Sequence, residues 1–111
     1  MRIGIIGAGR IGQVHARSVA ENPETNLIIV SDPNVAGAQA LADKYGARAV
    51  ADATDVINAD DVDAMIICSP TPFHGEQILA CVRAGKPALC EKPLAMDSAD
   101  ADALMKDLEG L

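Results

Sequence analysis

Short apolar runs alternate along this chain with longer segments in which apolar residues recur at helical spacing. The apolar runs are rich in Ile, Val and Ala, and runs of this length between turn residues predict β-strands. The predicted strands cover residues 2–6, 27–32, 48–50, 62–68 and 88–90. Between them, apolar residues recur every three or four positions, which predicts helices. The predicted helices cover residues 11–21, 35–45, 53–58, 73–84 and 98–108.

The order of these elements predicts a doubly wound α/β fold of the Rossmann type. Strands that alternate with helices form a parallel sheet with right-handed crossovers, and the helices then cover both faces in an α/β/α arrangement. We expect the strand order 3-2-1-4-5 within one domain that spans residues 1–111. The apolar end of the fourth strand is nearly continuous, which is typical of a central strand covered on both faces.

Several helix ends coincide with residues that stop or cap a helix. Pro23 follows the first predicted helix and Gly46 follows the second, while Asp52 or Thr54 is placed to cap the third. The first helix is expected to face the sheet with Ile11, Val14, Ser18 and Val19.

A glycine-rich turn follows the first strand. Gly7-Ala8-Gly9-Arg10-Ile11-Gly12 fits G-x-G-x-x-G, in which the first glycine permits a tight turn, the second lets a pyrophosphate approach the backbone, and the third lets the helix pack closely on the sheet. Phosphates are then expected on the N–H groups around Gly9 to Ile11, where the helix dipole is positive. Such turns also occur for structural reasons alone, but a position directly after the first strand favours dinucleotide binding.

Asp32 ends the second apolar run and follows Gly12 by 20 residues. A carboxylate at this spacing typically bonds the adenosine ribose hydroxyls of a dinucleotide. The alternative is a turn residue that opens Asp32-Pro33-Asn34. The same carboxylate would repel a 2′-phosphate, and no Lys or Arg follows before Lys44, so NAD is favoured over NADP.

Composition narrows the class of protein. Half of the 111 residues are hydrophobic but only 2% are aromatic, and the net charge of −7 argues against binding to nucleic acid or anionic membranes.

No targeting segment or apolar run long enough to cross a bilayer is visible, which favours a cytoplasmic location. No metal site is expected, because the acidic residues suit loops and helix starts and the cysteines have no ligand spacing. Cys68, Cys81 and Cys90 are interpreted as reduced core residues.

The turns after the fourth and fifth strands carry further candidate chemistry, because ligands of open parallel sheets lie beyond the carboxyl ends of the strands. After the fourth strand, hydroxyl and imidazole groups in Ser69-Pro70-Thr71-Pro72-Phe73-His74 could bond a ribose; equally, Thr71 could cap the next helix and His74 could be packed in its first turn. After the fifth strand, Glu91-Lys92-Pro93 is either a surface turn with an ion pair or a site where a lysine is tuned for proton chemistry.

Together these motifs resemble the glucose-fructose oxidoreductase/inositol dehydrogenase family, often written Gfo/Idh/MocA. The resemblance covers the whole chain, and its Glu-Lys-Pro turn is far more specific than the glycine motif. The run from Arg10 to Ala16 is most similar to the inositol 2-dehydrogenases of that family. The residues that carry the resemblance are the glycine motif followed by His15, Asp32, Ser69-Pro70-Thr71-Pro72 with His74, Gly85-Lys86-Pro87 and Cys90-Glu91-Lys92-Pro93-Leu94.

The resemblance implies hydride transfer between NAD and a hydroxyl carbon of a polyol or sugar. Lys92 would stand at the nicotinamide, bond the reacting hydroxyl and, as a cation, favour the developing alkoxide. Two other functions stay open: an NADP-dependent sugar oxidoreductase of the same family, and a non-catalytic regulatory module that binds a dinucleotide. The positions implied to contact the cofactor are Gly7, Gly9, Arg10, Ile11, Gly12, Asp32, Ser69, Thr71, His74, Glu91 and Lys92.

Members of the resembled family are about three times as long as this chain. Their sixth strand and second α/β domain, which carries the Asp and His of the substrate site and most oligomer contacts, have no counterpart here. We therefore expect the 111 residues to be the cofactor-binding part of such an enzyme and to show no turnover alone. No oligomeric state is predicted for the chain.

Overall fold

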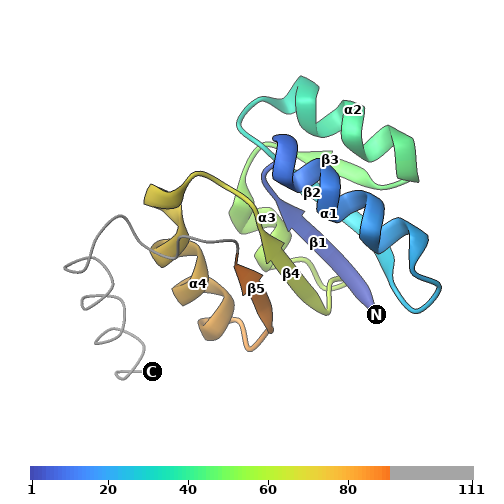
Figure 1. The fold of residues 1–111 in the computed structure, drawn as a ribbon. Coiled ribbons are helices and arrows are strands. Elements are labelled where there is room, and N and C mark those ends of the chain that lie inside the picture. Colours follow the sequence, from blue (N-terminus) through green and yellow to red (C-terminus); the bar gives the residue numbers. More distant parts are fainter. Residues whose placement is uncertain (91–111) are drawn as a thin grey trace.

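A five-stranded parallel sheet in the order β3-β2-β1-β4-β5 forms the centre of the computed structural model, which describes residues 1–90 (Figure 1). Every neighbouring pair of strands runs parallel. This arrangement confirms the predicted fold class and strand order. The strands are β1 (Arg2–Ile6), β2 (Asn26–Ser31), β3 (Arg48–Val50), β4 (Ala64–Ile67) and β5 (Ala88–Cys90).

In residues 1–90, helices cover both faces of the sheet, two on each (Figure 1). One face carries α1 (Arg10–Glu21) and α2 (Val35–Tyr45), and the other carries α3 (Ala53–Ile57) and α4 (His74–Arg83). A short 3₁₀ turn, Thr71–Phe73, precedes α4. The predicted helix over 98–108 lies outside the described residues. None of the helices in residues 1–90 is long and apolar enough to cross a membrane.

The period-2 geometry of the strands divides the core into two clusters. In β1, Ile5 packs with the residues under α1 and α2, whereas its neighbour Ile6 packs with those under α3 and α4. Gly4 also faces α3, because a Cβ at this position would lie 2.5 Å from Val56 Cγ1. The central strands are therefore apolar on both faces, which explains their nearly continuous hydrophobic sequence.

The predicted sheet-facing surface of α1 is wrong in part. Ile11 and Val14 are 46% and 57% exposed, whereas Gly12, Ala16 and Val19 are buried. The helix lies so close to the sheet that its contact positions hold small residues, and the bulky residues of the expected stripe are displaced to the solvent side. Apolar spacing gives most weight to large side chains and therefore predicts a helix face rotated from the observed one.

Most predicted boundaries and caps are confirmed. Gly46 ends α2 in the left-handed region, with φ of 70°, and Asp52 caps α3 by accepting a hydrogen bond from Thr54 N at 2.9 Å.

The three cysteines differ in burial. Cys81 is buried, and burial raises the pKa of its thiol to about 11. Cys68 and Cys90 are half-buried, and within residues 1–90 no disulfide joins any of the three cysteines.

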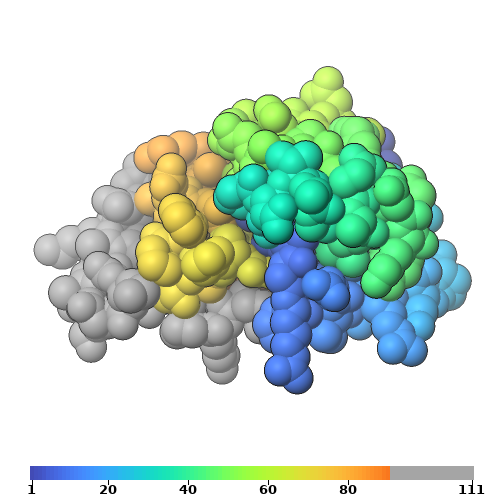
Figure 2. Space-filling view, turned by 90° about the horizontal axis from the view of Figure 1, so that it is seen from above, coloured from blue at the N-terminus to red at the C-terminus, as the bar shows by residue number. Residues whose placement is uncertain are grey.

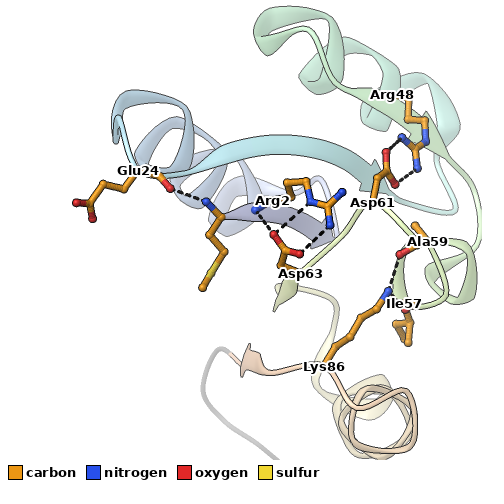
Figure 3. A network of polar contacts seen from close by, with 9 residues as sticks. Arg2, Glu24, Arg48, Ile57, Ala59, Asp61, Asp63 and Lys86 are labelled. Atoms are coloured by element: carbon orange, nitrogen blue, oxygen red, sulfur yellow. Dashed lines mark hydrogen bonds and ion pairs between the residues drawn. The ribbon is translucent and has the colours of Figure 1, made fainter.

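A polar network joins the segments at the amino-terminal end of the sheet (Figure 3). Asp63 accepts hydrogen bonds from Arg2 N at 2.8 Å and from Arg2 Nη2 at 3.0 Å. Asp61 accepts two bonds from the guanidinium of Arg48, at 2.6 and 2.7 Å. Lys86 donates to the carbonyl oxygens of Ile57 and Ala59, at 2.7 and 2.6 Å, and so ties the α4–β5 turn to the end of α3.

This network predicts a loss of stability in acid. Hydrogen bonds from Arg2 and Arg48 lower the pKa values of Asp63 and Asp61 from 3.8 to about 2 in the folded chain. Because the folded pKa values are depressed, the stabilisation is complete above pH 3.8 and disappears as the pH falls toward 2. We expect the thermal midpoint of Asp63→Asn to lie below that of the wild type at pH 6 and to converge with it near pH 2.

The control is Asp60→Asn, because Asp60 is exposed, lies outside the helices and forms no ion pair with a described residue. Its midpoint should track that of the wild type at every pH. Since both ion pairs are half-exposed, the difference at pH 6 is expected to be small. A difference in thermal midpoint between the wild type and Asp63→Asn that persists to pH 2 would contradict the lowered pKa of Asp63 as its cause.

Candidate functional site

A cleft of about 630 Å³ opens at the carboxyl ends of the strands. Figure 2 looks down on this edge, where the blue start of the chain, the teal segment after β2 and the yellow segment after β4 come together. Ligands of open α/β sheets bind at this position, where the chain crosses from one side of the sheet to the other. The lining residues are Ile6, Gly7, Ser31, Asp32, Pro33, Ala51, Asp52, Ala53, Ser69, Pro70, Phe73 and Gln77.

Two glycines of the motif have the structural roles that the sequence predicts. Gly7 adopts φ of 103°, and a Cβ there would lie 2.7 Å from the backbone C and O atoms of Cys68. A Cβ at Gly12 would lie 1.9 Å from Gly7 O, so only glycine lets α1 start this close to the turn. A Cβ at Gly9 would meet no atom of the described residues within 4 Å, and the space over the turn is therefore open.

The start of α1 presents backbone donors at this turn. Gly9 is the N-cap residue, and no side chain of the described residues caps the helix there. The first N–H groups of a helix have no partner within the helix, and the helix dipole places partial positive charge on them. No acidic residue occupies the first turn of α1. The donors of Arg10 and Ile11 therefore suit an anionic group, as the motif predicts.

Asp32 connects the glycine-rich turn to the segment after β2. Its Oδ2 accepts a hydrogen bond from Ala8 N at 2.8 Å, and its Oδ1 accepts one from Asn34 N, also at 2.8 Å. The neighbouring Ser31 carbonyl accepts from Gly7 N at 2.7 Å. The interpretation of Asp32 as a turn residue is thus confirmed, and its half-buried carboxylate also lines the cleft. Contact with a ribose stays a prediction.

The segment after β4 forms the opposite wall. Ser69 lines the cleft, whereas His74 is only 2% exposed and its Nε2 lies 2.5 Å from Ser69 O. His74 is therefore packed in the first turn of α4. Of the two roles that the sequence left open for it, packing is the one that the structure shows. Thr71 begins the 3₁₀ turn, and no side-chain hydrogen bond from the described residues caps either that turn or α4, so the capping role expected of Thr71 is wrong.

Arg10 does not line the main cleft. Its side chain lines a second hollow of about 500 Å³ between α1 and α2, which also contains Arg17, Lys44 and Tyr45. Glu91 and Lys92 lie outside the described residues, so their predicted roles stay predictions.

Part of the cleft wall carries no motif in the sequence. Gln77 accepts a hydrogen bond from the hydroxyl of Ser69 and lines the cleft, but it lies inside a predicted helix without a motif. Its only signal is the spacing of three residues from His74, which places both on one side of α4. The cleft is also lined by the segment after the short strand β3, Ala51, Asp52 and Ala53, in which nothing in the sequence indicates a ligand.

Within residues 1–90 no group of three or more His, Cys, Asp or Glu side chains is placed to hold a metal ion.

Comparison with known proteins identifies relatives along the whole chain. The family model described as "Oxidoreductase family, NAD-binding Rossmann fold" and named GFO_IDH_MocA matches residues 1–110. Inositol 2-dehydrogenase of Rhizobium meliloti is 42% identical over 107 residues, which are 96% of this chain and 32% of the relative. Myo-inositol 2-dehydrogenase of Thermotoga maritima is 37% identical over 108 residues, with 96% and 32% covered.

Solved structures give the same picture. The crystal structure of a myo-inositol dehydrogenase from Corynebacterium glutamicum superimposes with a TM-score of 0.94 at 44% identity, over 99% of this chain and 33% of that one. Scyllo-inositol dehydrogenase from Lactobacillus casei, solved with bound NAD(H) and scyllo-inositol, gives a TM-score of 0.89 at 28% identity with the same coverage. The chain thus spans about a third of the length of these relatives.

Proposed function

The chain belongs to the Gfo/Idh/MocA oxidoreductase family as an NAD-binding Rossmann domain, and we propose that it serves as the cofactor half of an NAD-dependent polyol dehydrogenase. The observation that carries the proposal is that Gly7 of the glycine-rich turn and Asp32 line one cleft, and that the uncapped start of α1 directly follows this turn. Relatives named as inositol 2-dehydrogenases support an inositol as the substrate. A cytoplasmic location belongs to the same proposal.

The described residues fit the parts of NAD. The N–H groups of Gly9, Arg10 and Ile11 would hold the pyrophosphate, and Asp32 would accept hydrogen bonds from the adenosine ribose. Apolar side chains, among them Pro33 and Phe73, line the cleft and suit the face of an adenine ring. The cofactor supplies the hydride acceptor of the reaction, and Lys92 is proposed to bond the hydroxyl that reacts.

The charge of the cleft supports NAD rather than NADP. Its described lining contains the carboxylates of Asp32 and Asp52 but neither Lys nor Arg. A 2′-phosphate beside Asp32 would meet like charge without a compensating cation, which disfavours its binding.

Calorimetric titration of the chain with NAD and, separately, with NADP tests this proposal. We expect NAD to bind and NADP to bind at least about tenfold more weakly, because close like charges oppose the 2′-phosphate. Circular dichroism before each titration checks that the sample is folded. NADP binding as tight as NAD binding, or no binding of either to the folded chain, would contradict the proposed cofactor role.

A further inference from the structure

Ser69 is held at both of its polar ends by residues of α4. Its hydroxyl donates to Gln77 Oε1, and its carbonyl oxygen lies 2.5 Å from Nε2 of the buried His74. The prolines Pro70 and Pro72 restrict the backbone between Ser69 and α4. The wall of the cleft after β4 is therefore a stiff segment that two side-chain contacts fix against one helix.

The same segment is in contact with the glycine-rich turn. A Cβ at Gly7 would lie 2.7 Å from the carbonyl of Cys68 and 2.9 Å from Ser69 N, so these backbones touch. Cys68 N also donates to Ile6 O at 2.7 Å. Because the backbones of Ser69 and Gly7 are in contact, we expect a shift of Ser69 to change the width of the cleft and to displace the turn.

We propose that Gln77 is a positioning residue for cofactor binding, which acts through Ser69 to fix the distance between the two walls of the NAD cleft. The inference rests on the proposed function. His74 already holds the carbonyl of Ser69, so without Gln77 the segment keeps its place in the fold but its hydroxyl side is free to move. Gln77 is half-buried, and it is the one residue of α4 that lines the described cleft. We therefore expect its replacement to affect this wall of the cleft.

A double-mutant cycle with Gln77→Leu and Ser69→Ala tests the proposal in the 111-residue chain. We expect each single variant to weaken NAD binding about fivefold, the size of one neutral hydrogen bond. The double variant should bind NAD no more weakly than the single variant with the lower affinity, because both changes remove the same hydrogen bond between Ser69 and Gln77. Gln39→Leu is the matched control, since Gln39 lies on α2 and donates to Asp43, away from the cleft; it should leave NAD binding unchanged.

Amide hydrogen exchange in the NAD-free chain gives a second measurement. Gly7 N and Ala8 N donate to Ser31 O and to Asp32, so a displaced turn should exchange these amides faster in Gln77→Leu but not in Gln39→Leu. Additive losses in the cycle, or unchanged exchange together with unchanged NAD affinity, would overturn the positioning role and leave the proposed function intact. A third outcome is faster amide exchange in Gln77→Leu together with a wild-type chain that binds no NAD. It would support the contact between Gln77 and Ser69, but it would overturn the proposed function and, with it, the role of Gln77 in NAD binding.

Discussion

Replacing Gly12 with alanine is expected to destabilise the domain and to remove most of its affinity for NAD. The new Cβ would lie 1.9 Å from Gly7 O and 2.9 Å from Gly7 C, and neither backbone atom can rotate away. Overpacking costs up to about 3 kcal/mol, and alanine gains roughly 1 kcal/mol over glycine within a helix. The free energy of unfolding should thus fall by about 2 kcal/mol, measured by urea denaturation.

Two other glycines separate the effect of packing from that of binding. Gly37 lies inside α2, and among the described residues a Cβ there would meet only the side chain of Asn34, at 3.4 Å or more, so Gly37→Ala should keep or slightly raise stability. Gly9→Ala places its Cβ in open space and should leave stability unchanged, but it should weaken NAD binding at least about tenfold by obstructing the approach of the pyrophosphate. Unchanged stability in Gly12→Ala would mean that α1 can move away from the turn without loss.

The sheet could be predicted because its pattern is local and redundant. Each strand is a short apolar run between turn residues, and the alternation of strands with helices leaves few topologies. Even the division of the core follows from one strand, since Ile5 and Ile6 must face opposite sides of the sheet. The glycine motif could be predicted for a similar reason: positive φ at Gly7 and close approach at Gly12 are demands that few other residues meet.

The parts that could not be predicted depend on distances between elements. The buried face of α1 consists of small residues because of how near the helix lies to the sheet, a quantity that apolar spacing does not encode. The bond between Ser69 and Gln77 joins the end of β4 to the second turn of α4, and it exists only because the 3₁₀ turn between them brings α4 back over the cleft. The role of Gly4, which is to leave space for Val56 of α3, likewise depends on the distance between two elements.

Removing the carboxylate of Asp32 is expected to weaken NAD binding more than any other side-chain change in the described part of the cleft. Hydrogen bonds to a charged group contribute about 1.5–3 kcal/mol, so loss of the proposed ribose contact in Asp32→Ala should raise the Kd for NAD roughly 10- to 150-fold. Binding of NADP should fall less, because the 2′-phosphate no longer meets a negative charge. Calorimetry with both dinucleotides measures the change in preference, and Asp43→Ala on the outer side of α2 is the matched control.

The same change also tests which of two roles of Asp32 dominates. Ala8 is buried, and without Asp32 its N–H has no acceptor, which should lower the free energy of unfolding by about 1–3 kcal/mol. The Asn34 N–H is exposed and can bond water instead, so its loss should matter little. A fall in stability with no change in the ratio of NAD to NADP affinity would mean that Asp32 only holds the turn. A change in that ratio requires the carboxylate itself to face the adenosine ribose, because the position of the turn affects both dinucleotides alike.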